Sequence, residues 1–183
     1  MNPPGNPLPC LRLARIEDVP ALDELIARSV RELLGRHYSP RQIAGALGSV
    51  FGVDRQLIRD GTYFVLEDSA RLVACGGWSR RRAPFGGDAA RTDPDPELNP
   101  ATDAARIRAF FVHPAWERRG LGRALLAASE SAARAAGFRR LELVATLAGE
   151  PLYRRHGFTE TQRTGVALAN GEFLPVVHMA KPI

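Results

Sequence analysis

Lysine and cysteine are nearly missing from this 183-residue chain: Lys181 is the only lysine, and Cys10 and Cys75 are the only cysteines. Two cysteines are too few for a disulfide framework, so we expect a protein of the reducing cytoplasm. No apolar run has the length that a membrane-spanning helix needs. The first residues also lack the basic and apolar regions of a signal peptide. Four prolines fall within residues 1–10, and we expect this segment to be a flexible arm.

Arginine supplies almost all of the positive charge, and the formal net charge is +5. A basic chain can bind nucleic acid, but such proteins usually gather their basic residues on one face. Here the arginines are scattered among acidic residues and alanines. Nucleic-acid binding is therefore the weakest of the functions that we consider. No change of composition divides residues 11–183, and their number suffices for one domain with a substantial core.

The first half of the chain alternates signals for strands and helices. Apolar residues recur at helical spacing between Asp18, a favourable N-cap, and Gly35, a typical stop. Gly76 and Gly77 indicate a bulge or a close backbone approach within a later strand. The elements expected here are a strand over 11–16, helices over 18–35 and 39–47, a brief helix after Asp54, and strands over 62–67 and 71–79 that form a hairpin.

Residues 81–103 form a long stretch rich in proline, glycine, aspartate and arginine. Structureless loops of this length are uncommon in compact domains, and they are usually functional or disordered. We expect either a flap over the site or a disordered insertion at the surface. Tyr38, in the loop over 36–38, and Trp78 also allow two interpretations, because each is either a connecting or packing residue or a part of the pocket.

The second half contains a strand–helix–strand unit, which predicts a parallel pair of strands with a right-handed crossover. Its parts are a strand over 107–112, a helix over 120–136 and a strand over 140–146. A short helix over 150–157 follows, and then a final hairpin with Asn170-Gly171 at its turn. The predicted fold class is α+β: a central mixed, mostly antiparallel sheet of about seven strands with helices on both faces.

Gly120 and Gly122 stand where the helix of this unit begins. The first N–H groups of a helix have no intrahelical acceptors and lie at the positive end of its dipole, so they bind anions well. The two glycines let a phosphate approach the backbone, and Arg118, Arg119 and Arg123 add cations around it. This pattern predicts a diphosphate site. The simpler interpretation is a glycine-tolerant helix start with solvated arginines.

Two stretches together resemble the GNAT superfamily of N-acetyltransferases: FFVHPAWERRGLGRALL over 110–126 and TLAGEPLYRRHGF over 146–158. The resemblance implies a GNAT fold from Leu11 onwards, acetyl-CoA (coenzyme A) as co-substrate, and no metal. It also implies that the strand residues pair with the pantetheine arm and that the glycine loop binds the pyrophosphate. The cofactor-binding residues expected on this basis are Phe110, Phe111, Val112, Arg118, Arg119, Gly120, Leu121, Gly122, Arg123, Thr146 and Tyr153.

Two positions depart from the family's pattern. Glu117 stands where the family has Gln or Arg, so its side chain is not expected to help the phosphate loop, although Arg118 or Arg119 can compensate. Thr146 is a shorter polar residue than the Asn of the family. Gly149 keeps its position small, and Tyr153 matches the family's tyrosine.

The resemblance implies an enzyme that transfers an acetyl group to a primary amine of a small molecule or peptide, by direct attack in a ternary complex. Backbone N–H groups near Phe111 and Val112 can stabilise the oxyanion. The phenol of Tyr153 can protonate the departing sulfur as general acid. The alternative for Tyr153 is a packed aromatic residue whose hydroxyl caps a helix.

No residue is assigned as the general base. Glu142, His113 and His178 are candidates, each with a plain structural interpretation as well, and a chain of water molecules is a fourth. The alternative function is that of a catalytically silent protein that binds acyl-CoA and regulates a partner. The sequence does not identify the acceptor amine, and a homodimer is compatible with it.

Overall fold

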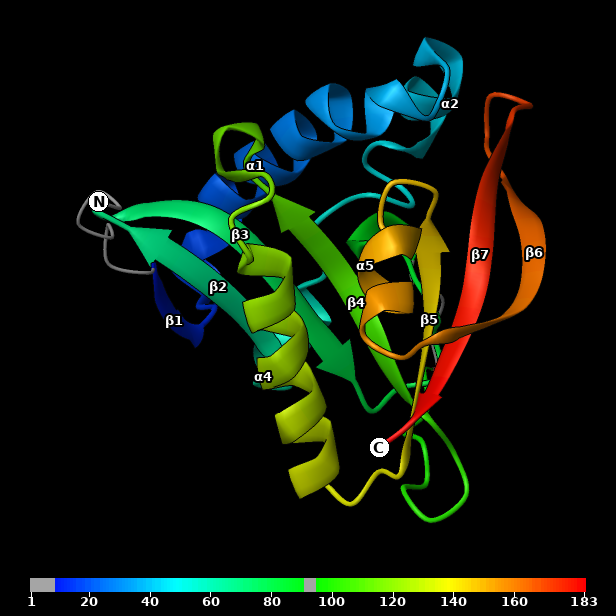
Figure 1. Cartoon of the computed structure of the whole chain (residues 1–183). Helices are drawn as coiled ribbons and strands as arrows, with labels where there is room; N and C mark the ends of the chain where they lie inside the picture. The colour runs from blue at the N-terminus through cyan, green and yellow to red at the C-terminus, as the bar shows by residue number, and fades with distance from the viewer. Residues whose placement is uncertain (1–8, 91–94) are drawn as a thin grey trace, which may run out of the picture.

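Seven strands form one sheet in the computed structural model, which describes residues 9–90 and 95–183 (Figure 1). The strand order is β1-β2-β3-β4-β5-β7-β6, and only the pair β4–β5 is parallel. The predicted mixed, mostly antiparallel sheet is therefore confirmed. The strands are β1 (Cys10–Leu13), β2 (Tyr63–Asp68), β3 (Arg71–Ser79), β4 (Ala105–Val112), β5 (Arg140–Thr146), β6 (Thr159–Ala167) and β7 (Phe173–Pro182).

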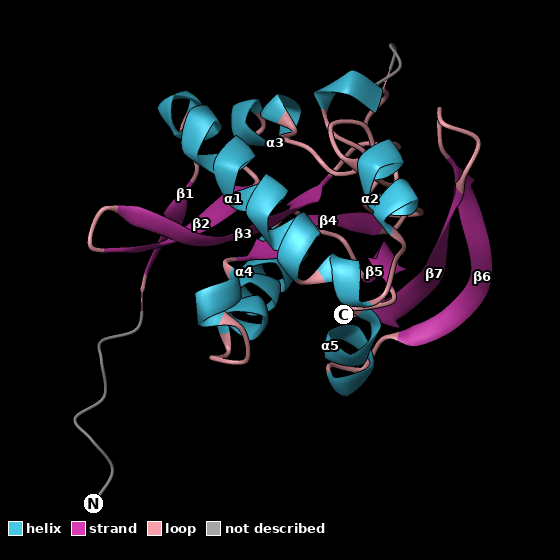
Figure 2. Ribbon diagram, turned by 90° about the horizontal axis from the view of Figure 1, so that it is seen from above, coloured by secondary structure: helices cyan, strands magenta, loops and turns pink. Residues whose placement is uncertain are grey.

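Helices cover both faces of the sheet (Figure 2). One face carries α1 (Val19–Glu32), α2 (Pro40–Ala46) and α3 (Arg55–Arg59), and the other carries α4 (Leu121–Ala135) and α5 (Glu150–Arg155). Single 3-10 turns lie at η1 (Ile16–Asp18), η2 (Leu34–Arg36), η3 (Asp88–Ala90) and η4 (Pro114–Trp116). Successive side chains of a strand point to opposite faces of the sheet, so neighbouring residues of β2 pack against different helices. Val65 packs in the cluster that contains Leu22 and Ile26 of α1, and Leu66 packs in the cluster that contains Leu125 of α4.

Polar side chains fix the starts of the short helices as the sequence predicts. The Ser39 hydroxyl accepts a hydrogen bond from the Gln42 N–H at 3.2 Å, and the Asp54 carboxylate accepts one from the Gln56 N–H at 3.0 Å. Each bond satisfies an N–H group that the helix itself leaves without a partner. The two caps therefore fix the residues at which α2 and α3 begin.

The start of the chain differs from the expectation at two points. The strand predicted over 11–16 ends at Leu13, because the chain turns into η1 and the Asp18 carboxylate accepts the Arg15 N–H at 2.7 Å. Asp18 precedes α1 as expected, but its carboxylate holds this turn and the Arg12 guanidinium instead of capping α1. Cys10 belongs to β1, and residues 1–8 of the expected arm lie outside the described residues.

Both predicted hairpins are present. Ser69 and Ala70 connect β2 to β3 with φ values of 49° and 63°, so two residues without glycine's freedom adopt the left-handed conformation. At the β6–β7 turn Gly171 has φ 83°, which glycine adopts without strain.

Candidate active site

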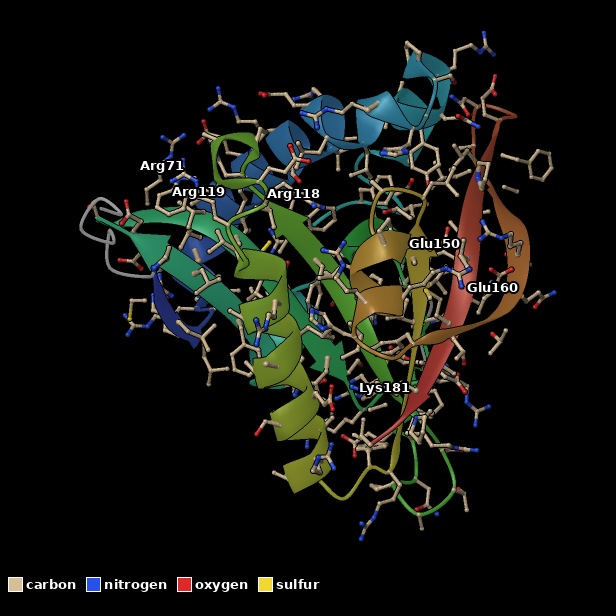
Figure 3. All side chains as sticks on the ribbon, in the orientation of Figure 1. Arg71, Arg118, Arg119, Glu150, Glu160 and Lys181 are labelled. Atoms are coloured by element: carbon tan, nitrogen blue, oxygen red, sulfur yellow. The ribbon has the colours of Figure 1, made fainter. Side chains whose placement is uncertain are left out.

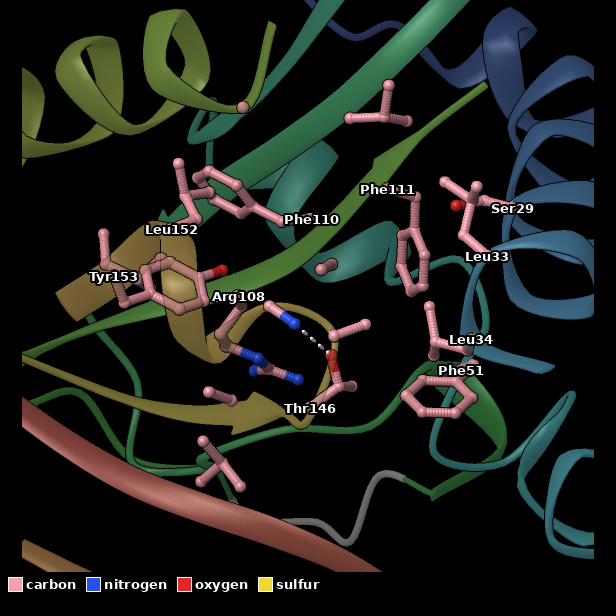
Figure 4. Close-up of a pocket in the computed structure, with 18 of the residues that line it drawn as sticks. Ser29, Leu33, Leu34, Phe51, Arg108, Phe110, Phe111, Thr146, Leu152 and Tyr153 are labelled. Carbon is pink, nitrogen blue, oxygen red and sulfur yellow. Dashed lines mark hydrogen bonds between the residues drawn. The ribbon is translucent and has the colours of Figure 1, made fainter. Parts of the chain in front are cut away.

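β4 and β5 separate part-way along their length. Their parallel pairing ends at Ile107 and Leu143, although β4 continues to Val112 and β5 to Thr146. Residues of both strands beyond that point line a cavity of about 580 Å³ (Figure 4). This volume is within the range of small-molecule sites.

A bulge in β4 shapes the wall of the cavity. Cys75 of β3 pairs with Phe111 and Gly77 pairs with Arg108, so Gly76 alone faces the two residues between them. One of these two, Ala109, has φ 57°. The ring of the other, Phe110, covers Gly76 so closely that a Cβ there would lie 2.6 Å from it. The sequence predicted a bulge or a close approach at the glycine pair of β3. The close approach is confirmed, since the Phe110 ring lies against Gly76, whereas the extra residue of the bulge belongs to β4.

The loop between β4 and α4 turns sharply before the helix begins. Arg118 and Gly120 have φ values of 62° and 83°, and the first bond of α4 runs from the Ala124 N–H to the Gly120 carbonyl at 3.1 Å. The N–H groups that precede Ala124 in α4 have no intrahelical acceptor, and the residues that carry them, 121–123, line the cavity. The structure thus brings a helix N-terminus to the cavity at the two glycines.

The three arginines of the predicted diphosphate site are not equivalent. Arg118 and Arg123 line the cavity. Arg119, on the same loop (Figure 3), is absent from its lining, and its guanidinium lies 4.9 Å from the centre of the Trp116 ring. Such stacking of a cation on an aromatic face stabilises the loop rather than a ligand. The structure therefore brings Arg118 and Arg123, but not Arg119, to the cavity.

Tyr153 of α5 faces the same space. Its ring packs edge-on against Phe110 and Phe158, with centroids 6.1 Å and 5.7 Å apart, and the residue is 7% exposed. The hydroxyl is directed into the cavity (Figure 4) and has no hydrogen-bond partner among the residues that the structure describes. Burial raises the pKa of the phenol, so it keeps its proton through neutral pH. A helix cap, the alternative interpretation, is not what this hydroxyl forms.

Thr146 lies at the end of β5 and also lines the cavity. Its hydroxyl accepts a hydrogen bond from the Gly149 N–H at 3.1 Å (Figure 4). A Cβ on Gly149 would lie 3.2 Å from that hydroxyl and 3.3 Å from the Tyr153 ring. The small residue thus lets the turn before α5 close tightly, and this turn positions Tyr153.

The cavity has two sides with different linings. We call the part lined by residues of the segments 116–123, without Arg119, and 149–156 the loop side. We call the part lined by residues of the segments 29–37, 50–52 and 84–86, with Val166 and Val176, the α1 side. Residues 107–112 of β4 run between them. All of the predicted site residues except Arg119 lie on the loop side, on β4 or at the end of β5.

Residues 59–160 match the family model of the acetyltransferase (GNAT) domain, which is more than half of the 183-residue chain. The chain belongs to the GNAT acetyltransferase family. The family expected from the two sequence stretches is therefore confirmed.

Solved acetyltransferases have a similar fold. A GCN5-related N-acetyltransferase of Rhodopseudomonas palustris has a TM-score of 0.70 and 21% identity over 96% of each chain. The PaiA N-acetyltransferase of Thermoplasma acidophilum, solved in complex with coenzyme A, has a TM-score of 0.64 and 14% identity over 95% of this chain and 98% of that one. A ribosomal-protein-alanine N-acetyltransferase of Brucella melitensis has a TM-score of 0.63 and 21% identity over 95% and 99%. No curated protein sequence matches the chain.

The described part of this GNAT protein has neither a candidate membrane span nor a candidate metal site. No helix within residues 9–90 and 95–183 has the length and apolar character needed to cross a membrane. In the same residues no group of three His, Cys, Asp or Glu side chains is placed to hold a metal ion.

None of the three candidates for the general base lines the cavity of this GNAT protein. Glu142 pairs with Arg106 across the β4–β5 pair. His178 Nε2 lies 2.9 Å from the Thr164 hydroxyl. His113 caps η4 through Nδ1, and its Nε2 lies 2.9 Å from the Arg71 guanidinium, so burial and neighbouring arginines lower its pKa. All three have structural roles where they stand.

Of the three features that allowed two interpretations, only the 81–103 stretch contributes residues to the cavity lining. Pro84, Phe85 and Gly86 line the α1 side, so part of the 81–103 stretch reaches the site, while residues 91–94 lie outside the described residues. Tyr38 does not line the cavity; its hydroxyl donates to the Pro175 carbonyl at 2.8 Å and accepts the Leu147 N–H at 2.9 Å. Trp78 is a core residue against Phe138.

Two ion pairs of this GNAT site were not foreseen from the sequence. Arg108 of β4 lines the cavity and pairs with Asp54 at 2.9 Å, with side-chain exposures of 3% and 1%. Glu117, the residue that departs from the family's pattern, pairs with Arg36 of η2 at 3.0 Å. A charged residue within the apolar run of β4 was the available signal for the first pair. No signal pointed to the second, because its partners are 81 residues apart.

Proposed function

We propose that this GNAT protein is an acetyl-CoA-dependent N-acetyltransferase that acts on a primary amine of a small molecule or peptide by direct attack in a ternary complex. One observation carries the proposal. The separation of β4 and β5 opens a single cavity that is lined by the N-terminus of α4, the bulged wall of β4 and the Tyr153 hydroxyl. These are the parts that an anionic acyl carrier and its reacting thioester need.

The residues present fit a diphosphate at the loop side. The N–H groups of residues 121–123 are the donors, and the Arg118 and Arg123 side chains add charge. Gly120 has no heavy atom within 4 Å of a Cβ position, so the approach to the backbone is open there. A Cβ on Gly122 would lie 3.1 Å from Leu152, so this glycine also lets α5 pack close to the start of α4. The backbone of Phe110, Phe111 and Val112 would hold the pantetheine arm, with Thr146 near its end.

The acetyl thioester supplies the acyl group, and the residues of the chain act on the atoms around it. The neutral amine nitrogen bonds to the carbonyl carbon, and the carbon–sulfur bond then breaks. Backbone N–H groups near Phe111 and Val112 would stabilise the charge on the oxygen, typically by a few kcal/mol per donor. Tyr153 would give its proton to the departing sulfur, and the amine would lose its own proton to solvent. The phenolate of Tyr153 would then take a proton back from solvent.

A covalent acyl-enzyme has no support in this site. Cys75, the only described cysteine on the central strands, is fully buried and does not line the cavity. Burial raises the pKa of its thiol to about 12, so the nucleophilic thiolate is not formed near neutral pH. Direct attack on the thioester therefore agrees best with the residues at hand.

The substitution Tyr153→Phe tests the proposed role of the phenol. It keeps the ring contacts with Phe110 and Phe158 and removes only the hydroxyl, so the fold and the affinity for acetyl-CoA should be unchanged. We expect turnover, measured as coenzyme A release with an amine acceptor, to fall by about 100-fold. Because the pKa is raised, turnover of the unmodified enzyme should not decline with rising pH until above the ordinary phenol pKa of about 10. Unchanged turnover in the variant would exclude Tyr153 as general acid.

Cofactor binding is tested separately by thermal unfolding. Acetyl-CoA should raise the melting temperature, because a ligand that binds only the native state stabilises it. No shift at saturating acetyl-CoA would contradict the proposal. A clear shift without coenzyme A release from any amine would instead favour a catalytically silent acyl-CoA-binding protein that regulates a partner.

A further inference from the structure

We infer that the acceptor is a small primary amine whose remaining body is uncharged and apolar, with an aryl or alkyl group next to the reacting nitrogen. This inference deepens the proposed function and rests on it. It concerns the α1 side of the cavity, where none of the motif residues lies.

The surface of the α1 side is mainly hydrocarbon. Its apolar residues belong to, or pack against, the core cluster between α1, α2 and the sheet, and they come from elements far apart in the sequence. The residues of that cluster that line the cavity include Leu33, Leu34, Val50, Phe51, Val166 and Val176. A cavity wall of this kind gains free energy when an apolar group replaces water against it.

Aromatic rings stand at the point where the α1 side meets β4. Phe51 packs edge-on against Phe111, with centroids 6.1 Å apart and an interplanar angle of 85° (Figure 4). Phe85 adds a further ring to the lining. Edge-to-face arrangements extend readily to another ring, so an aryl group suits this wall at least as well as an alkyl chain.

The charges around the α1 side disfavour an acceptor with a second ammonium group. Its titratable residues are the bases Arg36 and His37, with Arg108 adjoining on β4. Within residues 9–90 and 95–183, Glu117 is the one carboxylate of the cavity lining, and it already pairs with Arg36 at 3.0 Å. Arg108 is likewise paired, with Asp54 at 2.9 Å. A polyamine would therefore bring a second charge into apolar surroundings whose carboxylate already has a partner, and the carboxylate of an amino acid would meet arginines that are already paired.

The same surroundings help the chemistry. An amine must lose its proton before it attacks, and burial against an apolar wall favours the neutral form. This agrees with a cavity in which none of the predicted base candidates takes part. The size agrees as well, because the cavity of about 580 Å³ must also hold the end of the acyl carrier, which leaves room for a small acceptor only.

Matched pairs of amines test the inference on the unmodified enzyme, with coenzyme A release as the readout. Hexylamine and 1,6-diaminohexane differ by a second cation, and 2-phenylethylamine and phenylalanine differ by a carboxylate. We expect kcat/KM to be at least about tenfold higher for the uncharged member of each pair. A peptide with a free amino terminus should be a poorer acceptor than 2-phenylethylamine.

A variant tests whether the α1 side makes the selection. Val166 is only partly buried, so Val166→Glu places a carboxylate in the lining with little risk to folding, and Val166→Gln is the uncharged control. We expect Val166→Glu to raise the ratio of diaminohexane to hexylamine turnover about tenfold, since it supplies the missing partner for the second ammonium. Val166→Gln should leave that ratio near its original value.

The outcomes separate the inference from the proposed function. Higher kcat/KM for diaminohexane, phenylalanine or the peptide would overturn the inference while leaving the acetyltransferase activity in place. An unchanged ratio in Val166→Glu would also overturn it, provided that acetyl-CoA still raises the melting temperature of the variant. No release of coenzyme A with any of these amines would contradict the proposed function itself.

Discussion

The loop side and the α1 side of the cavity are lined by different kinds of chemical groups. On the loop side, two short segments present backbone N–H groups, glycines and one phenol to the cavity. On the α1 side, side chains from α1, from the segments around Phe51 and Phe85, and from β6 and β7 meet over the sheet. The first side depends on local backbone conformation, and the second on tertiary packing.

This difference means that the two sides place different demands on the sequence. Backbone donors at a helix N-terminus recognise a phosphate with few demands on side chains, and glycines at fixed spacing suffice. Hydrophobic walls are made by many residues, each replaceable by another of similar volume. We therefore expect substitutions on the two sides to have separable effects, on the acyl carrier and on the acceptor respectively.

The largest expected effect comes from the ion pair that fastens the α1 side to β4. Arg108 pairs with Asp54 at 2.9 Å and donates to the Gly86 carbonyl at 2.6 Å, so it joins both neighbouring segments to the sheet. Arg108→Met would leave the buried Asp54 carboxylate without this cation, which typically costs about 3–5 kcal/mol. Denaturant unfolding should show this loss of the free energy of unfolding.

A second substitution distinguishes charge from packing at this pair. Asp54→Asn keeps an oxygen that can accept the Gln56 N–H and thus retains the cap of α3. Combined with Arg108→Met, it should restore part of the lost stability, because no uncompensated buried charge remains. If the double variant is no more stable than Arg108→Met alone, the loss comes from packing instead.

The sequence predicted the loop side well, for reasons that lie in particular residues. Gly120 and Gly157 have φ values of 83° and 86°, so the local conformation before α4 and after α5 favours glycine at both places. Gly122 and Tyr153 complete the two patterns at the starts of these segments. The order of strands and helices followed from the periodicity and from caps such as Ser39. The bounds were wrong by several residues at the first strand, where Asp18 stabilises η1, and at the end of the first helix. That helix ends at Glu32, and Gly35, the predicted stop, lies within η2.

The α1 side could not be predicted, because its residues meet only in three dimensions. Leu34 and Val166 are separated by 131 intervening residues, and nothing in either local pattern links them. Tyr38 shows why a local pattern is not enough. It follows residues that line the cavity, but its hydroxyl is hydrogen-bonded to the backbone of Pro175 and Leu147 instead. The base candidates fail for the same reason: His113 is close in sequence to the site but faces Arg28 and Arg71.

The next largest effect is expected at the wall of β4 against which Tyr153 packs. In Gly76→Ala the new Cβ would stand 2.6 Å from the Phe110 ring, so the ring must move, and overpacking of this kind costs about 1–3 kcal/mol. Because that ring supports Tyr153, turnover should fall along with the melting temperature. Gly35→Ala is the control, since no heavy atom lies within 4 Å of its Cβ position, and its stability should change by less than about 0.5 kcal/mol. Equal effects of the two variants would contradict the steric account of the bulge.

The smallest effect is expected at the pair that links the two sides, Glu117 with Arg36. Glu117 lines the cavity beside the helix N-terminus, where its negative charge opposes an incoming phosphate, while Arg36 offsets only part of that charge. Glu117→Gln should therefore bind acetyl-CoA more tightly by less than about 1 kcal/mol, and the gain should shrink as salt screens the charges. Titration of acetyl-CoA at low and high salt measures this.

Glu160→Gln is the control for this prediction. It removes a surface carboxylate that pairs with Arg154 and Arg163 outside the cavity lining, and it should leave the affinity unchanged. Weaker binding in Glu117→Gln would mean that the carboxylate assists the loop, by holding Arg36 in place for the ligand, and the two sides would then share the work of binding the acyl carrier.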